Sequence, residues 1–206
     1  DELCHAAIFD WLTTNKWNDK LLEIQSPHLE NYLKKHTAQT DQTDLVARYD
    51  LLWKYYEKSG QFMAAARVLS RLSDAHSTLI NLPTRIEYLS RAIVCARAAE
   101  TSSFGNAVQG QFLYELEEKM DVAKVQSQVL DAVIRMPGNN SELIGRLNAD
   151  LLDVTQLYEQ FTEPLGLWEC KLAILHCAGH YDAALVSNVW LNIINNEVKK
   201  LSPVGD

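Results

Sequence analysis

Glycine and proline are scarce in this sequence, which has eight glycines and five prolines in 206 residues. Sandwiches and barrels need many turn residues, so this shortage argues against an all-β fold. The sequence has four cysteines, too few for a disulfide framework, and we expect free thiols in a reducing compartment. No apolar run approaches the roughly 18 residues of a membrane span, so we expect no membrane contact.

Positive charge is the minority charge: 19 Lys and Arg stand against 27 Asp and Glu, a formal net charge of −8. A chain of this sign does not bind nucleic acid through its bulk charge. The 47% hydrophobic and 22% charged residues are ordinary for a globular protein that buries a sizeable core. The sequence begins at Asp1 with no Met and no apolar signal segment, so we expect a part of a longer protein.

Motifs for phosphate or metal binding are missing as well. The segment 105–110 has the glycine spacing of a phosphate loop, but Gln111 and Phe112 stand where Lys and Ser or Thr are needed. The densest group of metal-ligand residue types is Cys170, His176, Cys177 and His180. On a helix, however, the two cysteines would lie about 10 Å apart, too far to share one zinc ion. We therefore expect no metal and no cofactor.

Catalytic patterns are equally absent. The acidic clusters are expected on polar helix faces in contact with water, where carboxylates keep their ordinary chemistry; they comprise Glu115, Glu117, Glu118, Asp150 and Asp153. No nucleophile-elbow, zinc-protease or dinucleotide-binding motif occurs. The sequence therefore predicts a protein that is not an enzyme.

Apolar residues recur at three- and four-residue spacing along nearly the whole chain, which predicts an all-α protein of about ten helices. Proline at a first helical position or an acidic cap marks several expected starts, such as Ser26-Pro27, Asp44 and Asp182. The most regular apolar stripe predicts one helix from Leu143 to Phe161, broken by Glu163-Pro164. The segments Leu165–Ala178 and Ala183–Lys200 are expected to form a final helical hairpin.

Another predicted hairpin turns at Ser59-Gly60, where alanines 64–66 would let two helices approach closely. Its apolar, small and glycine residues have the spacing of one tetratricopeptide hairpin; they are Leu52, Tyr56, Gly60, Ala65 and Leu69. No second copy follows about 34 residues later. Short connections fit either a closed bundle or a stack of helix pairs, and the unequal helix lengths favour an irregular solenoid.

Arginines and tryptophans are the remaining groups of interest. Five arginines, interleaved with acids, predict a mixed hydrated face; they are Arg67, Arg71, Arg85, Arg91 and Arg97. Trp53 and Trp168 lie on or beside helical stripes and are expected in the core. Trp190, with Ile193 and Ile194, belongs to the last helix, whose outer face an end position in a stack would leave open for a partner.

Several runs of the sequence closely resemble the C-terminal region of a scaffold nucleoporin of the 155/170 class, a family of the nuclear pore inner ring. They are Asp50–Lys58, Ala65–Leu72, Phe112–Met120 and Glu169–Gly179. The resemblance implies a C-terminal α-solenoid segment over residues 1–201. We expect the tail at 202–206 to be frayed. The resemblance also implies a structural, non-enzymatic role in the nuclear pore complex at the nuclear envelope, supporting transport.

The resemblance implies other nucleoporins as partners, namely linker and FG-type segments and neighbouring scaffold subunits. It assigns no binding residues. Our candidates Trp168, Trp190 and Ile194 come from the open-end hypothesis alone. The alternative is a helical-repeat adaptor of a vesicle coat or another large assembly, which fits the same composition.

Overall fold

The computed structural model describes the chain except residues 1, 25, 37–41, 103–106 and 202–206. The described residues form α-helices and one π-helical segment, with no β-strand among them, so the all-α prediction is confirmed. The chain divides into two compact units. Unit 1 comprises Asp1–Leu79 and Thr84–Glu117, and unit 2 comprises Ile80–Pro83 and Glu118–Asp206. The predicted tail 202–206 lies outside the described residues.

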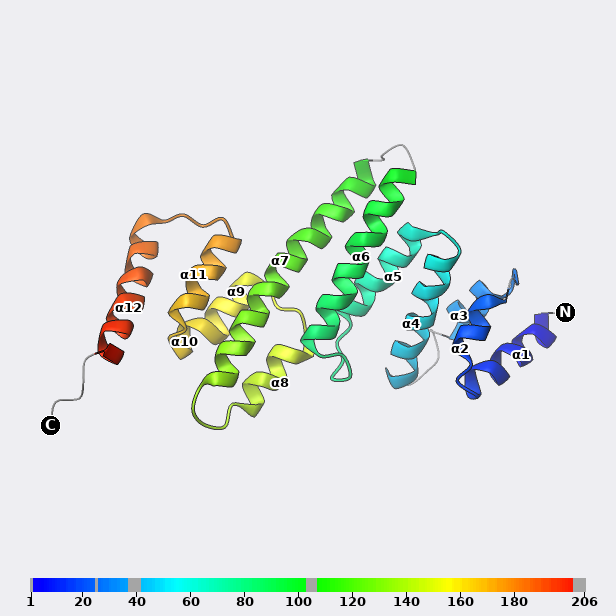
Figure 1. The fold of residues 1–206 in the computed structure, drawn as a ribbon, viewed down its shortest axis with the longest axis horizontal. Helices are drawn as coiled ribbons and strands as arrows, with labels where there is room; N and C mark the ends of the chain where they lie inside the picture. Colours follow the sequence, from blue (N-terminus) through cyan, green and yellow to red (C-terminus); the bar gives the residue numbers. More distant parts are fainter. Residues whose placement is uncertain (1, 25, 37–41, 103–106, 202–206) are drawn as a thin grey trace. The chain divides into compact units, whose positions relative to one another are not determined.

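Unit 1 is built from the first five helices and parts of the next two (Figure 1). These helices are α1 (Glu2–Thr14), α2 (Asn18–Glu23), α3 (Leu29–His36), α4 (Gln42–Lys58), α5 (Phe62–Asp74), α6 (Leu82–Ser102) and α7 (Ala107–Arg135). Two predicted starts were wrong. Helix α3 begins at Leu29, two residues after Pro27, although the Ser26 hydroxyl accepts the His28 N–H at 3.2 Å. Helix α4 begins at Gln42, so Asp44 lies inside it.

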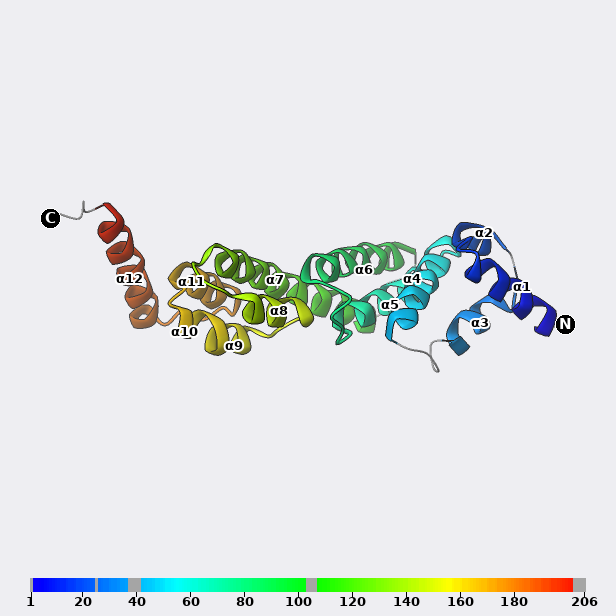
Figure 2. The same cartoon turned by 90° about the horizontal axis from the view of Figure 1, so that it is seen from below.

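The α4–α5 pair is the predicted hairpin, and its two helices run antiparallel and side by side (Figures 1 and 2). Gly60 has φ +73°, a left-handed conformation that glycine adopts without a Cβ penalty. Ala65 and Ala66 are fully buried, which lets the helix backbones approach closely. Trp53, on the same hairpin, is also buried, as the sequence predicted.

Helix α1 buries only some of its apolar residues. Phe9 and Leu12 are buried, while Leu3, Ile8 and Trp11 are exposed to 78, 51 and 55%. Phe9 packs against Tyr32 of α3, and the Tyr32 hydroxyl donates to Asp10 at 2.6 Å. The contacts of α1 with other helices therefore determine which of its faces is buried. The neighbouring apolar positions remain exposed to solvent.

Unit 2 contains the end of α7 and the remaining helices. They are α8 (Ser141–Ala149), α9 (Val154–Leu157), the π-helix η1 (Tyr158–Thr162), α10 (Glu163–Leu165), α11 (Trp168–Cys177) and α12 (Ala183–Leu201). The single helix predicted from Leu143 to Phe161 was wrong. The chain becomes extended at Asp150, and the Asp153 side chain then caps α9 in a reciprocal capping box with Gln156. Asp150 and Asp153 thus lie at a helix break instead of on a polar helix face.

Candidate functional site

The three candidate residues all belong to the α11–α12 hairpin of unit 2, whose helices pack against each other. Beside them lies a groove with a volume of about 460 Å³. Trp168 lines this groove and is half-buried, so its prediction as a core residue was only partly right. The groove is lined by Ala132, Gly166, Leu167, Trp168, Glu169, Cys170, Ile193, Asn196, Glu197 and Lys200.

The position of Trp168 follows from an irregular stretch of backbone just before it. Pro164 lacks an N–H and cannot continue a regular helical hydrogen-bond pattern, and the helix widens into the π-turn η1, where the Glu163 N–H bonds to the Tyr158 carbonyl. The helix ends at Gly166, whose φ of +62° is left-handed, instead of at Glu163-Pro164 as predicted. The Leu167 N–H bonds back to the Thr162 carbonyl at 3.0 Å, so Trp168 starts α11 in a defined direction.

A buried lysine holds the Trp168 ring. Lys171 Nζ lies 3.9 Å from the centroid of the Trp168 ring and 5.6 Å from that of Tyr158, and it pairs with the Glu163 carboxylate. The Lys171 side chain is 2% exposed, so these contacts take the place of the water that surrounds an exposed ammonium group. Lys171 was not among the residues singled out from the sequence, since a lysine on a helix is usually exposed and its spacing carries no sign of burial.

This ion pair predicts a pH dependence. The hydrogen bond from Lys171 is the main cause that lowers the pKa of Glu163 below its ordinary value of 4.5. A carboxylate with a lowered pKa stabilises the folded state above the unfolded pKa, and this contribution is lost as the pH falls through the folded pKa. We expect the stability difference between wild type and Glu163→Gln, measured by thermal melts, to shrink as the pH falls below 4.5. Near-ultraviolet circular dichroism of the tryptophans should change over the same range.

The matched control for this prediction is Glu169→Gln, an exposed carboxylate at the rim of the same groove. The stability difference between this variant and wild type should not show the same change with pH, because the buried Lys171 pairs with Glu163 and not with Glu169. A stability difference for Glu163→Gln that is independent of pH would contradict the role given to the ion pair.

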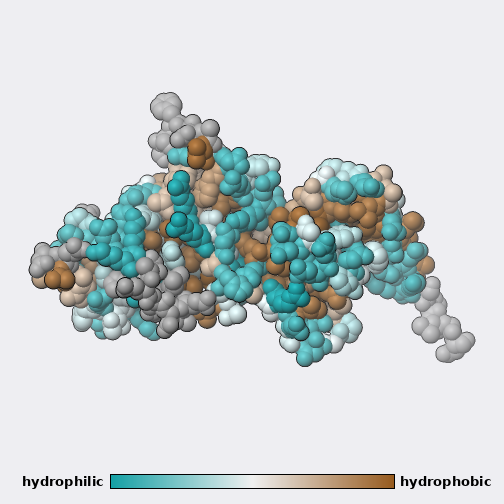
Figure 3. Space-filling model, turned by 180° about the vertical axis from the view of Figure 1, so that it is seen from behind, coloured by the Kyte–Doolittle hydropathy of each residue, from teal (hydrophilic) through white to brown (hydrophobic). Residues whose placement is uncertain are grey.

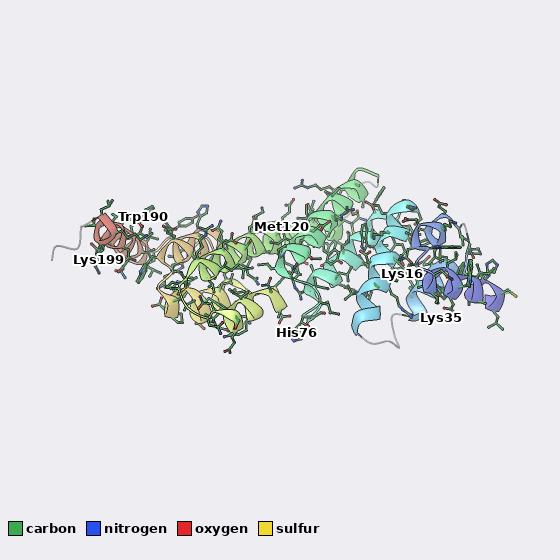
Figure 4. The ribbon with its side chains drawn as sticks, turned by 60° about the horizontal axis from the view of Figure 1, so that its bottom comes forward. Lys16, Lys35, His76, Met120, Trp190 and Lys199 are labelled. Carbon is green, nitrogen blue, oxygen red and sulfur yellow. The ribbon has the colours of Figure 1, made fainter. Side chains whose placement is uncertain are left out.

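Trp190 and Ile194 do not line the groove. Both lie on α12, where Trp190 is 49% and Ile194 53% exposed. Trp190 is labelled on this helix in Figure 4. The two residues belong to a larger exposed row of apolar side chains, which we call the α12 stripe: Trp190, Leu191, Ile194, Val198 and Leu201. Hydrophobic surface is visible over the α11–α12 hairpin in Figure 3. Three- and four-residue spacing in the sequence could have identified Leu191, Val198 and Leu201 as members of this stripe.

The groove combines apolar side chains with three charged ones. Glu169, Glu197 and Lys200 are exposed at its rim, and Lys200 pairs with Glu197 at 2.5 Å. The structure does not assemble the cluster around Cys170 and Cys177 into a metal site, and no group of three or more metal-ligand residues occurs among the described residues. No described helix is long and apolar enough to cross a bilayer. An aromatic side chain beside an apolar hollow and an exposed apolar stripe suit a peptide or a helix of another protein.

Comparison with known proteins gives a consistent assignment. A family model described as the non-repetitive/WGA-negative nucleoporin C-terminal region matches residues 1–204. The nuclear pore complex protein Nup154 of Drosophila melanogaster is 41% identical over 203 residues, which are 97% of this chain and 15% of that protein. Nucleoporin NUP170 of Saccharomyces cerevisiae is 29% identical over 92% of this chain and 12% of its own length. This chain thus spans only a small part of these relatives.

Solved structures agree with the sequence comparison. The Chaetomium thermophilum Nup170 C-terminal domain, in its complex with Nup145N, superposes with a TM-score of 0.80 and 27% sequence identity. The match covers 95% of this chain and 37% of that one. A longer solved segment of the same fungal protein, Nup170 SOL, gives a TM-score of 0.81 at 26% identity. That match covers 95% of this chain and 26% of the fungal segment. The fold and the sequence therefore point to the same group of proteins.

Proposed function

Because this chain belongs to the non-repetitive/WGA-negative nucleoporin C-terminal family, we propose that it is a non-enzymatic scaffold element of the nuclear pore inner ring. In this role the α11–α12 hairpin docks segments of other nucleoporins, of the linker or FG type, and the segment also meets neighbouring scaffold subunits. The docking residues are Trp168, in the groove, and Trp190 and Ile194, on the α12 stripe.

The broader assignment rests on the family itself. The chain is the C-terminal region of a 155/170-class nucleoporin, a component of the nuclear pore complex at the nuclear envelope. Its helices have the solenoid-type fold of the Nup170 C-terminal domain. The vesicle-coat alternative shares the composition and fold class, but the family match favours the nuclear pore. Scaffold proteins of this kind support transport by holding other components in place.

One observation carries the docking proposal: an exposed apolar hairpin surface occurs on a chain whose structural relative was solved bound to Nup145N. The groove volume of about 460 Å³ lies within the range of about 300–1,000 Å³ that is usual for ligand pockets. The α12 stripe continues this apolar surface along the next face of the helix. We therefore expect a partner segment with an apolar anchor in the groove and further apolar residues along the stripe.

We expect one peptide from a tiled set across the disordered regions of linker and FG nucleoporins to bind saturably at a one-to-one ratio in calorimetric titrations. Trp168→Ala and the double variant Trp190→Ala/Ile194→Ala should each weaken this binding by at least about tenfold, since buried anchor residues commonly contribute about 2 kcal/mol. The matched control is Trp11→Ala, a tryptophan of unit 1 that is 55% exposed, against 49% for Trp190; it should leave the affinity unchanged.

Two outcomes would count against the proposal. Unchanged affinity in both hairpin variants would place the docking residues elsewhere. Absence of binding by every peptide, with the protein shown to be folded by circular dichroism, would favour a segment whose contacts are to folded scaffold subunits.

A further inference from the structure

The arginine cluster of the sequence separates into two groups in the structure. Three of the five arginines have hydrogen-bond or ion-pair partners within the chain. Arg85 is fully buried and donates to three backbone carbonyls, which corrects its prediction as part of a hydrated face. Arg91 lies 3.6 Å from Glu87 and over the Trp53 ring, and Arg97 donates to Glu117 at 2.6 Å. The other two arginines, Arg67 and Arg71, are exposed, and neither has an ion-pair partner among the described residues.

Arg67 and Arg71 lie one helical turn apart on α5, so both guanidinium groups project from the same side of the helix. Ser70 lies between them in the sequence and adds a hydroxyl group to this side. Guanidinium groups form paired hydrogen bonds with carboxylates and phosphates, and two guanidiniums at this spacing can bind one such group together.

These three residues form one wall of a hollow of about 630 Å³ within unit 1. The opposite wall comes from the first turns of α7 and consists of Val108, Gln111, Phe112 and Glu115. Phe112 is half-buried and Val108 is 65% exposed, so this wall presents apolar surface to solvent. Glu115 accepts a hydrogen bond from Gln111 at 3.0 Å, on its own helix, and forms no ion pair with either arginine.

We propose that this hollow, which we call the α5–α7 hollow, binds an acidic peptide segment of a partner protein. A carboxylate or phosphate of the segment lies between Arg67 and Arg71, and an apolar side chain next to it packs on Phe112 and Val108. The charge of the chain supports this ligand class. At a net charge of −8 the protein repels acidic segments in general. Two exposed arginines beside an apolar wall therefore mark the place where an acidic segment can bind.

This site differs from the α11–α12 docking surface in both location and chemistry. It lies in unit 1, whereas the hairpin lies in unit 2, and it recognises charge together with one apolar group. The two proposals can therefore fail separately, because substitutions at one surface leave the other intact.

The test uses three fluorescein-labelled synthetic peptides with the whole chain, followed by fluorescence anisotropy. The first contains a Leu-Leu pair followed by glutamates, the second has phosphoserine in place of the first glutamate, and the third has lysines in place of all acids. We expect saturable binding of one or both acidic peptides and none of the lysine peptide. The better acidic peptide identifies whether the preferred anion is a carboxylate or a phosphate.

The double variant Arg67→Glu/Arg71→Glu should bind the acidic peptides at least about tenfold more weakly, because charge-assisted paired hydrogen bonds are lost. Lys58→Glu/Lys199→Glu is the matched control: it makes the same change in net charge at two exposed lysines outside the hollow. Replacing Leu-Leu by Ser-Ser in the peptide should also weaken binding, because the apolar wall then loses its contact.

Equal losses in the two double variants would show that bulk charge alone attracts the peptides and would overturn the proposal. Lack of saturation by both acidic peptides with wild-type protein would overturn it too. Circular dichroism melts confirm that both variants fold, and exposed arginines on a helix surface are not expected to alter the melt.

Discussion

Replacing Arg85 with methionine is expected to destabilise unit 1 by about 3–5 kcal/mol, one of the two largest effects predicted for this chain. The Arg85 side chain is fully buried, and its guanidinium donates to the carbonyls of Ser73 and Ala75 at 2.7 Å and of Ser77 at 2.9 Å. Methionine fills a similar space but offers no donor. Three carbonyl oxygens at the end of α5 and in the following loop would lose their partner.

Arg85 lies where its charge does not suit its own helix, so its hydrogen bonds to the end of α5 outweigh the local preference of α6. It lies in the first turn of α6, where a positive charge is unfavourable to that helix, while it stabilises the carboxyl end of α5. Urea unfolding followed by circular dichroism measures the effect. Arg71→Met, on an exposed arginine without an ion-pair partner among the described residues, is the control and should stay within about 0.5 kcal/mol of wild type. Equal stability of the two variants would contradict this account.

Replacing Gln126 with leucine is expected to destabilise unit 2 by about 2–4 kcal/mol. The buried Gln126 amide donates from Nε2 to the Leu147 and Asp150 carbonyls, each at 2.7 Å, and its Oε1 accepts the Leu152 N–H at 2.9 Å. One side chain of α7 thereby pairs three backbone groups at the break between α8 and α9. Leucine has nearly the same volume, so the loss comes from unpaired polar groups and not from a cavity.

The same denaturation experiment tests this prediction, with Gln128→Leu as the control, because Gln128 lies two residues away on α7 and is exposed. The control should change stability by less than about 0.5 kcal/mol. If Gln126→Leu proved as stable as its control, the break between α8 and α9 would have to be held by other contacts. Methyl or amide resonances of the groove around Trp168 would show whether the loss spreads to the candidate site.

The candidate site was only partly accessible from the sequence. Trp190 and Ile194 were identified because apolar residues recur along the last helix, and the structure leaves both exposed. Trp168 was expected in the core and was also a candidate for partner binding. It lines a groove, since its direction depends on the π-turn and on Gly166. Lys171 escaped attention because burial of a lysine depends on Glu163 and on two aromatic rings that meet only in the folded chain.

The sequence by itself determined the helical class, the α4–α5 hairpin, the Asp182 cap of α12 and, through whole runs of residues, the nucleoporin family. Periodicity and turn residues act within a few positions of each other, so they can be recognised without tertiary contacts. The tertiary structure decided which face of α1 is buried, where the stripe from Leu143 to Phe161 breaks, and which arginines are paired. These features depend on contacts between residues far apart in the chain, and a local pattern carries no information about them.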